Sequence, residues 1–204
     1  MDVLITGTSQ GIGLACARLF LERGHRVWGI DIQPATIEHE HYQHFLANVA
    51  EKNQLPANLE PELIVNNAGV QGSADDIAVN LVGTMNVTEA YAFVGEGLAA
   101  TPAPRIHSVV NVGSASGHTG SEFPAYAASK GGILAYTKNV ANRLARRPSA
   151  TASTPAACSP SSTAASWTTS ACGAASWTSR RCAAGPRPPR LPSGSTSWAS
   201  RTGS

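Results

Sequence analysis

Tyr126 and Lys130, four residues apart, are the side chains of this sequence whose types and spacing best suit acid/base chemistry. In a helix, positions i and i+4 lie on one face, about one turn apart. A phenol alone has a pKa of about 10 and is a poor acid or base at neutral pH, but a neighbouring ammonium favours the phenolate. The pair therefore predicts a general acid/base, provided that a cofactor and a hydroxyl donor lie beside it. The alternative is two residues on a solvated helix face.

A glycine-rich turn near the start of the sequence is the first element that could bring a cofactor to this pair. Residues 2–6 are typical of a buried parallel strand, and residues 14–21 have the pattern of an amphipathic helix. A turn between such elements presents backbone N–H groups and the positive end of a helix dipole to phosphates. Its glycines permit the tight turn, the approach of a pyrophosphate and close helix–strand packing. We expect a dinucleotide to contact Gly7, Ser9, Gln10, Gly11, Ile12 and Gly13.

An acidic residue, Asp31, ends the second predicted strand, residues 25–31, and lies 18 residues after Gly13. A carboxylate there can accept hydrogen bonds from adenosine ribose hydroxyls and would repel a 2′-phosphate. Neither the glycine turn nor the next few residues offer an Arg or Lys to hold such a phosphate. The sequence therefore predicts NAD rather than NADP, with Ile32 in the same site.

A third strand is predicted over residues 44–49, with Asn48 and Val49 at its end, close to where an adenine would lie. His39, His41 and His44 occur in the same region. No other ligand-spaced residues accompany these histidines, so we interpret them as part of a solvated loop and predict no metal site.

Five motifs, taken together and in order, resemble those of the short-chain dehydrogenase/reductase family. They are Thr6-Gly7-x-x-x-Gly11-Ile12-Gly13, Asn66-Asn67-Ala68-Gly69, Val79-Asn80-Leu81-x-Gly83, Ser114 and Tyr126-x-x-x-Lys130. The resemblance covers residues 1 to about 145 and is highly specific. It implies an α/β domain with a doubly wound parallel sheet, a Rossmann fold, in residues 1–147. It also implies that Asn67, Ala68 and Gly69 line the adenosine-ribose side of the cofactor.

The same resemblance implies a catalytic role for each of four residues. Ser114 follows a predicted strand, residues 108–112, and would donate a hydrogen bond to the substrate oxygen; Ser116 is the local alternative. Tyr126 would exchange the proton, and Lys130 would also bind the nicotinamide ribose. Asn80 would hold a water through its backbone and connect Lys130 to solvent. The expected activity is an NAD-dependent oxidation of a secondary alcohol or reduction of a ketone. Hydroxysteroids, 3-oxoacyl thioesters and sugar or polyol alcohols all remain open as substrates.

Expectations about partners and location follow from the same resemblance and from composition. The helices predicted over residues 76–97 and 125–145 would, by resemblance, pair in a homodimer or homotetramer. No apolar run approaches 18 residues and no basic leader precedes the first strand, so we expect a soluble, cytoplasmic protein without a membrane partner. The spacing of the four cysteines suggests neither a zinc site nor a disulfide framework.

Residues 148–204 depart abruptly from the family pattern. They contain five Arg and no acid, whereas all 13 Asp and Glu lie at or before residue 122. Apart from Leu191 they consist of Ala, Ser, Thr, Pro, Arg, Gly, Trp and Cys, with no strand period, which taken literally predicts a low-complexity tail. The arginines are too few, and lack an aromatic platform, to predict nucleic-acid binding.

The genetic code provides a more specific hypothesis for this tail. Every residue type in it except leucine has G or C at the middle codon base, as a one-base shift of a GC-rich gene would produce. We therefore interpret residues 148–204 as a shifted reading of the family's C-terminal third, from near Arg147. Such a chain would lack the last core strands and the substrate-covering segment. The rival function is accordingly a catalytically impaired dinucleotide-binding or scaffold protein.

Overall fold

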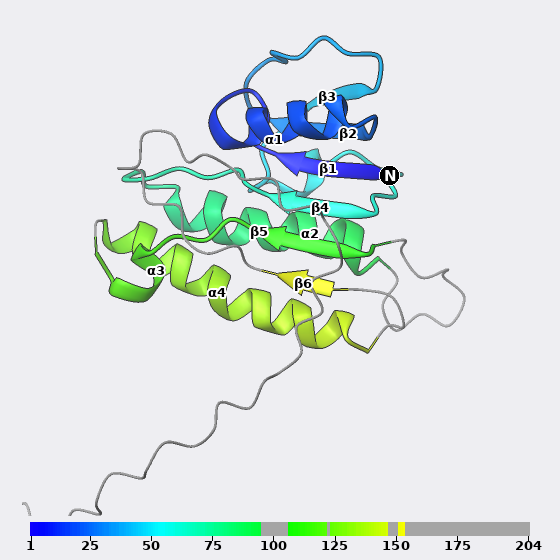
Figure 1. The fold of residues 1–204 in the computed structure, drawn as a ribbon. Helices are drawn as coiled ribbons and strands as arrows, with labels where there is room; N and C mark the ends of the chain where they lie inside the picture. The colour runs from blue at the N-terminus through cyan, green and yellow to red at the C-terminus, as the bar shows by residue number, and fades with distance from the viewer. Residues whose placement is uncertain (95–105, 122, 147–150, 154–204) are drawn as a thin grey trace, which may run out of the picture. The chain divides into compact units, whose positions relative to one another are not determined.

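The chain forms a parallel α/β domain, seen here in a computed structural model that describes residues 1–94, 106–121, 123–146 and 151–153. Six strands form one sheet in the order β3-β2-β1-β4-β5-β6, and every adjacent pair is parallel (Figure 1). The strands are β1 (Asp2–Thr6), β2 (Arg26–Asp31), β3 (Tyr42–Leu46), β4 (Leu63–Asn66), β5 (Ser108–Asn111) and β6 (Thr151–Ser153). The strand order reverses its direction between β1 and β4. The predicted doubly wound parallel sheet is therefore confirmed.

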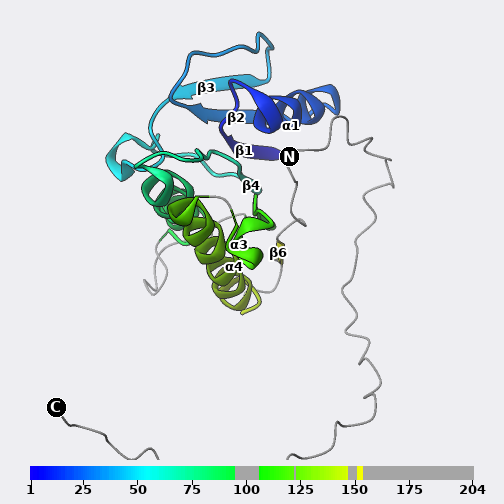
Figure 2. The ribbon, with the colours of Figure 1, turned by 90° about the vertical axis from the view of Figure 1, so that its left-hand side faces the viewer.

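Helices cover both faces of the sheet, α1 on one and α2 with α4 on the other (Figure 2). The helical elements are α1 (Gly11–Glu22), a 3₁₀ turn η1 (Lys52–Gln54), a π-helical segment η2 (Ile77–Gly83), α2 (Thr84–Ala92), α3 (Ser116–Thr119) and α4 (Pro124–Leu144). Successive strand residues point to opposite faces. As a result Val3 packs with Ala17 and Leu21 of α1, whereas Leu4 belongs to the core beneath α2 and α4.

The third strand differs from the sequence predictions in its bounds and in its residues. The third strand ends at Leu46 instead of reaching residue 49, because pairing with β2 stops at the Asp31–Leu46 register. Val49 is nevertheless buried, since it belongs to the core cluster that includes Leu4 and Ile64 and lies directly against Gly83 of η2. His44, which the sequence placed both at the start of the predicted strand and among the loop histidines, lies within β3, so the loop interpretation is wrong for this histidine.

The helix predicted over residues 76–97 is divided into η2 and α2 and ends at Ala92; positions 95–97 lie outside the described residues. The helix predicted over residues 125–145 is confirmed as α4, which begins at Pro124, a residue favoured at the first helical position.

The strand β6 lies beyond residue 147, where the sequence predicts no strand. Its three residues pair in parallel with Ser108–Val110 of β5, so the predicted absence of a strand is wrong at this point. The remainder of the tail, residues 154–204, lies outside the described residues. In the part of the chain that is described, no helix is both long and apolar enough to cross a membrane.

Candidate active site

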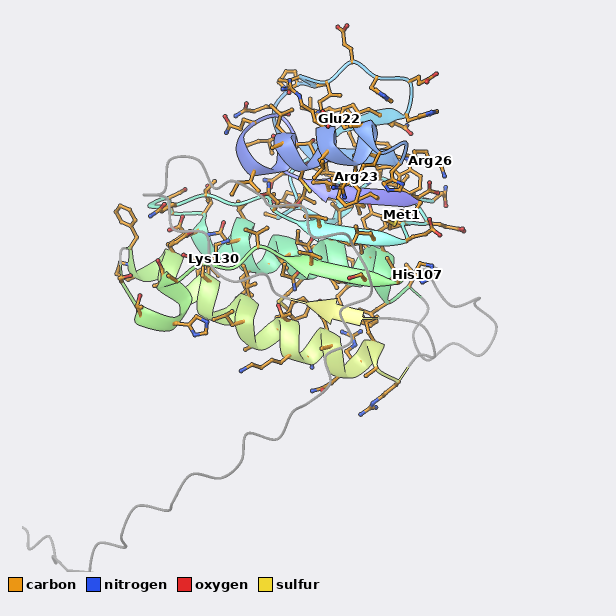
Figure 3. All side chains as sticks on the ribbon, in the orientation of Figure 1. Met1, Glu22, Arg23, Arg26, His107 and Lys130 are labelled. Atoms are coloured by element: carbon orange, nitrogen blue, oxygen red, sulfur yellow. The ribbon has the colours of Figure 1, made fainter. Side chains whose placement is uncertain are left out.

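A cavity of about 590 Å³ lies at the carboxyl ends of the strands, where ligands bind in open α/β sheets. Its wall is formed by residues that follow β1, β2, β3, β4 and β5, together with two side chains of α4. Figure 3 shows Lys130 at this end of the sheet, whereas Met1, Arg26 and His107 lie at the opposite end. The topology therefore brings together segments that are more than a hundred residues apart in the sequence.

The glycine turn has the geometry of a phosphate cradle. Gly7 and Gly11 have positive φ angles of 75° and 58°, which side-chain-bearing residues rarely adopt. A Cβ on Gly13 would overlap the Gly7 carbonyl oxygen, so the helix can begin this close to the turn only with glycine. Around Gly11, by contrast, there is open space, and the start of α1 faces the cavity. The donor groups of a helix N-terminus are thus directed at a site large enough for phosphates.

Asn67 connects this turn to the loop that follows β4. Its side-chain amide donates hydrogen bonds to the carbonyl oxygens of Thr6 (3.0 Å) and Gly7 (3.2 Å). In return the Thr6 hydroxyl accepts the backbone N–H groups of Asn67 and Ala68, both at 3.0 Å. The two loops that form the floor of the cavity are therefore held together by direct hydrogen bonds.

The Asp31 carboxylate lies at the cavity wall and is fixed by main-chain donors. One oxygen accepts the N–H of Ser9 and the other accepts the N–H of Gln33, each at 2.9 Å. The Ser9 side chain does not reach the cavity wall, because its hydroxyl donates to the Gln33 carbonyl oxygen at 3.1 Å. Ser9 therefore holds Asp31 in position, and the carboxylate keeps free lone pairs toward the cavity.

Tyr126 and Lys130 both line the cavity from α4, as their four-residue spacing predicts. The Lys130 ammonium lies 5.7 Å from the centroid of the Tyr126 ring and donates a hydrogen bond of 2.9 Å to the Val112 carbonyl oxygen after β5. Lys130 is only 5% exposed, and burial lowers its pKa from the ordinary value of 10.5 to about 8. A lysine with this pKa can hold or release a proton near neutral pH.

The short helix α3 lies directly against α4 at this lysine. A Cβ on Gly117 would come within 2.7 Å of the Lys130 backbone, so the absence of a side chain there allows the close approach. Ser114 precedes α3 and is buried. Its hydroxyl accepts the Ser116 N–H at 3.2 Å and donates to the Ser116 hydroxyl at 3.3 Å. It must therefore turn toward the cavity before it can donate to a substrate.

Asn80 is fully buried and does not line the cavity. Its side chain accepts the Val70 N–H at 2.7 Å and donates to the Val70 carbonyl at 2.8 Å and to the Ser129 hydroxyl at 3.0 Å. Ser129 in turn donates to the Tyr126 carbonyl oxygen at 2.7 Å. Asn80 thus joins the loop after β4 to the turn of α4 that carries the tyrosine.

The structure places most of the predicted site residues around one cavity. Thirteen of them line it: Gly7, Gln10, Gly11, Ile12, Asp31, Ile32, Asn48, Val49, Asn67, Ala68, Gly69, Tyr126 and Lys130. Ser9, Gly13, Asn80 and Ser114 are buried behind the wall. Among the residues that the sequence analysis missed are Val112 and Gly113. Their position immediately after β5 was the available signal, since the ends of β1, β2, β3 and β4 all contribute residues to the cavity.

Comparisons with known proteins agree with this architecture. A family model described as short chain dehydrogenase matches residues 2–169. The chain is 31% identical over 165 residues to the 3-oxoacyl-(acyl-carrier-protein) reductase FabG of Vibrio harveyi, covering 71% of this chain and 67% of that protein. It is 34% identical over 164 residues to the short chain dehydrogenase ausX of Penicillium brasilianum, covering 70% and 62%. The chain therefore spans about two thirds of the length of these relatives.

Solved structures of dehydrogenases superpose on this chain and therefore have the same fold. An oxidoreductase of the short-chain dehydrogenase/reductase family from Burkholderia thailandensis superposes with a TM-score of 0.61 at 28% identity, covering 71% of this chain and 64% of that one. A 4-hydroxyisoleucine dehydrogenase complexed with NADH superposes with a TM-score of 0.60 at 26% identity, covering 71% and 70%. Because the family model also matches well over half of the sequence, the chain belongs to the short-chain dehydrogenase/reductase family.

Proposed function

We propose that this protein is an NAD-dependent oxidoreductase that interconverts a secondary alcohol and a ketone, with Tyr126 as the general acid/base. The observation that supports the proposal best is the convergence of Tyr126, Lys130, Asp31 and the glycine turn on one cavity. A bound nicotinamide cofactor would supply or accept the hydride.

The residues at the cavity fit such a cofactor. The open space around Gly11 and the start of α1 suit the pyrophosphate, and the Asp31 carboxylate suits the adenosine ribose hydroxyls. Among the described residues that line the cavity, Lys130 is the only cation, and it belongs to the α4 side. A 2′-phosphate beside Asp31 would meet a carboxylate without a compensating charge. These features favour NAD over NADP, and the NADH complex of a solved relative is consistent with a nicotinamide cofactor.

The chain's own residues perform the proton chemistry in this proposal. Tyr126 donates its phenolic proton to the ketone oxygen during reduction and removes the alcohol proton during oxidation. The Lys130 ammonium stabilises the phenolate and can exchange its proton near neutral pH, because burial lowers its pKa to about 8. Ser114, once turned from Ser116, donates a hydrogen bond to the same substrate oxygen. Asn80 keeps Tyr126 in position through Ser129. A water held by the Asn80 backbone, connecting Lys130 to solvent, is a further part of the proposal.

The substrate class and the assembly are further parts of the proposal. A hydroxysteroid, a 3-oxoacyl thioester or a polyol would each present a carbinol carbon to Tyr126. We also propose a homodimer or homotetramer through η2, α2 and α4, since Ile77, Val82 and Met85 are 38% to 40% exposed on the first two of these elements. A Val82→Arg variant that remains as large as the unmodified protein in light scattering would contradict this interface.

Turnover on a panel of these alcohols, followed by NADH absorbance, tests the function. We expect turnover by the unmodified chain and a loss of about a hundredfold or more in Tyr126→Phe. NADH binding, measured by nicotinamide fluorescence, should persist in that variant. Tyr91→Phe is the matched control, because the Tyr91 hydroxyl donates to the Pro56 carbonyl oxygen at 2.7 Å and does not line the cavity. NADH binding without turnover on any alcohol would favour the non-catalytic dinucleotide-binding protein instead.

A further inference from the structure

A chain of hydrogen bonds behind the ribose side of the cavity connects the glycine turn with β3 and with the loop after β2 through side chains that no family motif names. The Tyr42 hydroxyl of β3 lies 2.9 Å from the Thr8 hydroxyl in the glycine turn and 2.9 Å from Nδ1 of His44. The other ring nitrogen of His44, Nε2, lies 2.9 Å from the Gln33 carbonyl oxygen. Gln33 is the residue whose N–H holds the Asp31 carboxylate. The chain therefore ends on the loop that fixes this carboxylate.

The directions of these hydrogen bonds follow from the chemistry of the partners. A carbonyl oxygen only accepts, so Nε2 of His44 carries the proton and donates to Gln33. In the neutral ring Nδ1 then accepts, and the Tyr42 hydroxyl donates to it. The Tyr42 oxygen remains available to accept the hydroxyl proton of Thr8. Burial raises the pKa of the Tyr42 phenol, so the donor in the middle of the chain keeps its proton.

The neighbouring strand leaves room for this arrangement. Gly29 lies in the middle of β2, and a Cβ at this position would overlap both the Tyr42 and the Thr8 hydroxyls. Glycine weakens a strand interior and commonly marks the close approach of another group. The Tyr42 and Thr8 hydroxyls can therefore meet beside β2 only because position 29 carries no side chain.

We propose that Tyr42 and His44 are positioning residues that hold Gln33 and, through it, the Asp31 carboxylate for the adenosine ribose, and that they thereby set the preference for NADH over NADPH. The proposal rests on the proposed function at Asp31 and goes beyond it by naming the side chains that maintain the selectivity. Neither residue lines the cavity. They act through the loop, and their loss leaves the acid/base pair on α4 untouched.

The test compares the affinities of NADH and NADPH in three variants. Tyr42→Phe removes the hydrogen bonds to both Thr8 and His44. It should weaken NADH binding about fivefold, because only the bond to His44 leads to the loop that holds Asp31. His44→Leu removes both contacts and should weaken NADH binding about tenfold. His44→Gln keeps a donor at the ε position and should restore the affinity to within about twofold. In Tyr42→Phe and His44→Leu the NADPH affinity should not fall in parallel, because a released carboxylate no longer repels a 2′-phosphate from a fixed position.

Tyr136→Phe is the control, since its hydroxyl also has a hydrogen-bond partner, the Glu89 carboxylate at 2.9 Å, but lies outside the cavity. Equal losses of NADH and NADPH affinity in Tyr42→Phe and in Tyr136→Phe would show that Tyr42 has a merely structural role and would overturn the proposal. Nitrogen-15 spectra of the cofactor-free protein provide an independent readout: a proton on Nε2 of His44 supports it, and a proton on Nδ1 overturns it. If the unmodified chain binds no NADH but shows the Nε2 proton, the proposed function fails and the hydrogen-bond chain stands.

Discussion

Replacing Lys130 with methionine should stabilise the protein at neutral pH. Lys130 is buried on α4, and burial lowers its pKa from 10.5 to about 8. Because one pKa unit corresponds to about 1.4 kcal/mol, holding the charged form costs the folded state about 3.5 kcal/mol at neutral pH. Methionine removes this cost but also loses the hydrogen bond from the ammonium to the Val112 carbonyl, worth about 1.5 kcal/mol. The net gain expected for Lys130→Met is therefore about 2 kcal/mol.

The pH dependence of this gain has a definite sign. Between its folded pKa of about 8 and the ordinary value of 10.5, the lysine binds more protons in the unfolded state than in the folded state. The stability contributed by this residue therefore rises with pH across that window, whereas below it the full cost remains. The advantage of Lys130→Met should shrink from about 2 kcal/mol at about pH 6.5 to near zero by about pH 9.5 to 10.

Urea unfolding of both proteins at about pH 6.5, 8 and 9.5 measures this difference as free energies of unfolding. Lys138→Met is the matched control, because Lys138 is exposed on the same helix. Its effect should be small and independent of pH. A Lys130→Met variant that is less stable than the unmodified chain at about pH 6.5, or a difference that does not change with pH, would refute the argument.

Three further predictions concern other parts of the chain. Gly13→Val should cost about 3 kcal/mol in urea unfolding, because its side chain would overlap the Gly7 carbonyl oxygen; a neutral effect would contradict the close packing of the turn. Arg143 lowers the pKa of Glu89 below its ordinary value of 4.5, so this pair stabilises the fold above that pH and loses its effect as the pH falls through the lowered pKa. Glu89→Gln should therefore cost only about 1 kcal/mol at neutral pH, since the carboxylate is partly exposed, and the loss should vanish in acid. Resequencing of the coding DNA should reveal a one-base change of frame near Arg147, and an uninterrupted frame through Pro148 would disprove that interpretation.

The sequence alone was sufficient to predict those strands and helices whose pattern is contained within a short run of residues. The apolar runs that became β1, β4 and β5 are continuous, as expected for strands covered on both faces. The four-residue spacing of Tyr126 and Lys130 placed both at the cavity because α4 is regular there. Three of the motifs, the glycine turn, residues 66–69 and Ser114, lie at the carboxyl ends of strands. Because these strand ends meet at one edge of a parallel sheet, most of the cavity could be predicted.

The features that were missed depend on contacts distant in sequence. Val49 belongs to an apolar run that resembles a strand, but it lies after β3 and is buried in the core that includes Leu4 and Ile64, beside Gly83, 34 residues later. β6 is a Thr-Ala-Ser segment without an apolar pattern and forms through pairing with β5. His44 has both ring nitrogens in hydrogen bonds, to Tyr42 and to the Gln33 carbonyl, which its own sequence neighbourhood does not indicate. Long-range pairing of this kind leaves little local signal.

We propose that this chain transfers a hydride between an alcohol and NAD, with Tyr126 as the acid/base. The most direct measurement is the transfer of deuterium from pooled secondary alcohols, deuterated at the carbinol carbon, to NAD⁺, detected by mass spectrometry of the reduced nucleotide. We expect deuterium in the NADH formed by the unmodified protein and at most a trace with Tyr126→Phe. No deuterium in the NADH formed by the unmodified protein, or equal amounts with the unmodified protein and Tyr126→Phe, would rule out the proposed function.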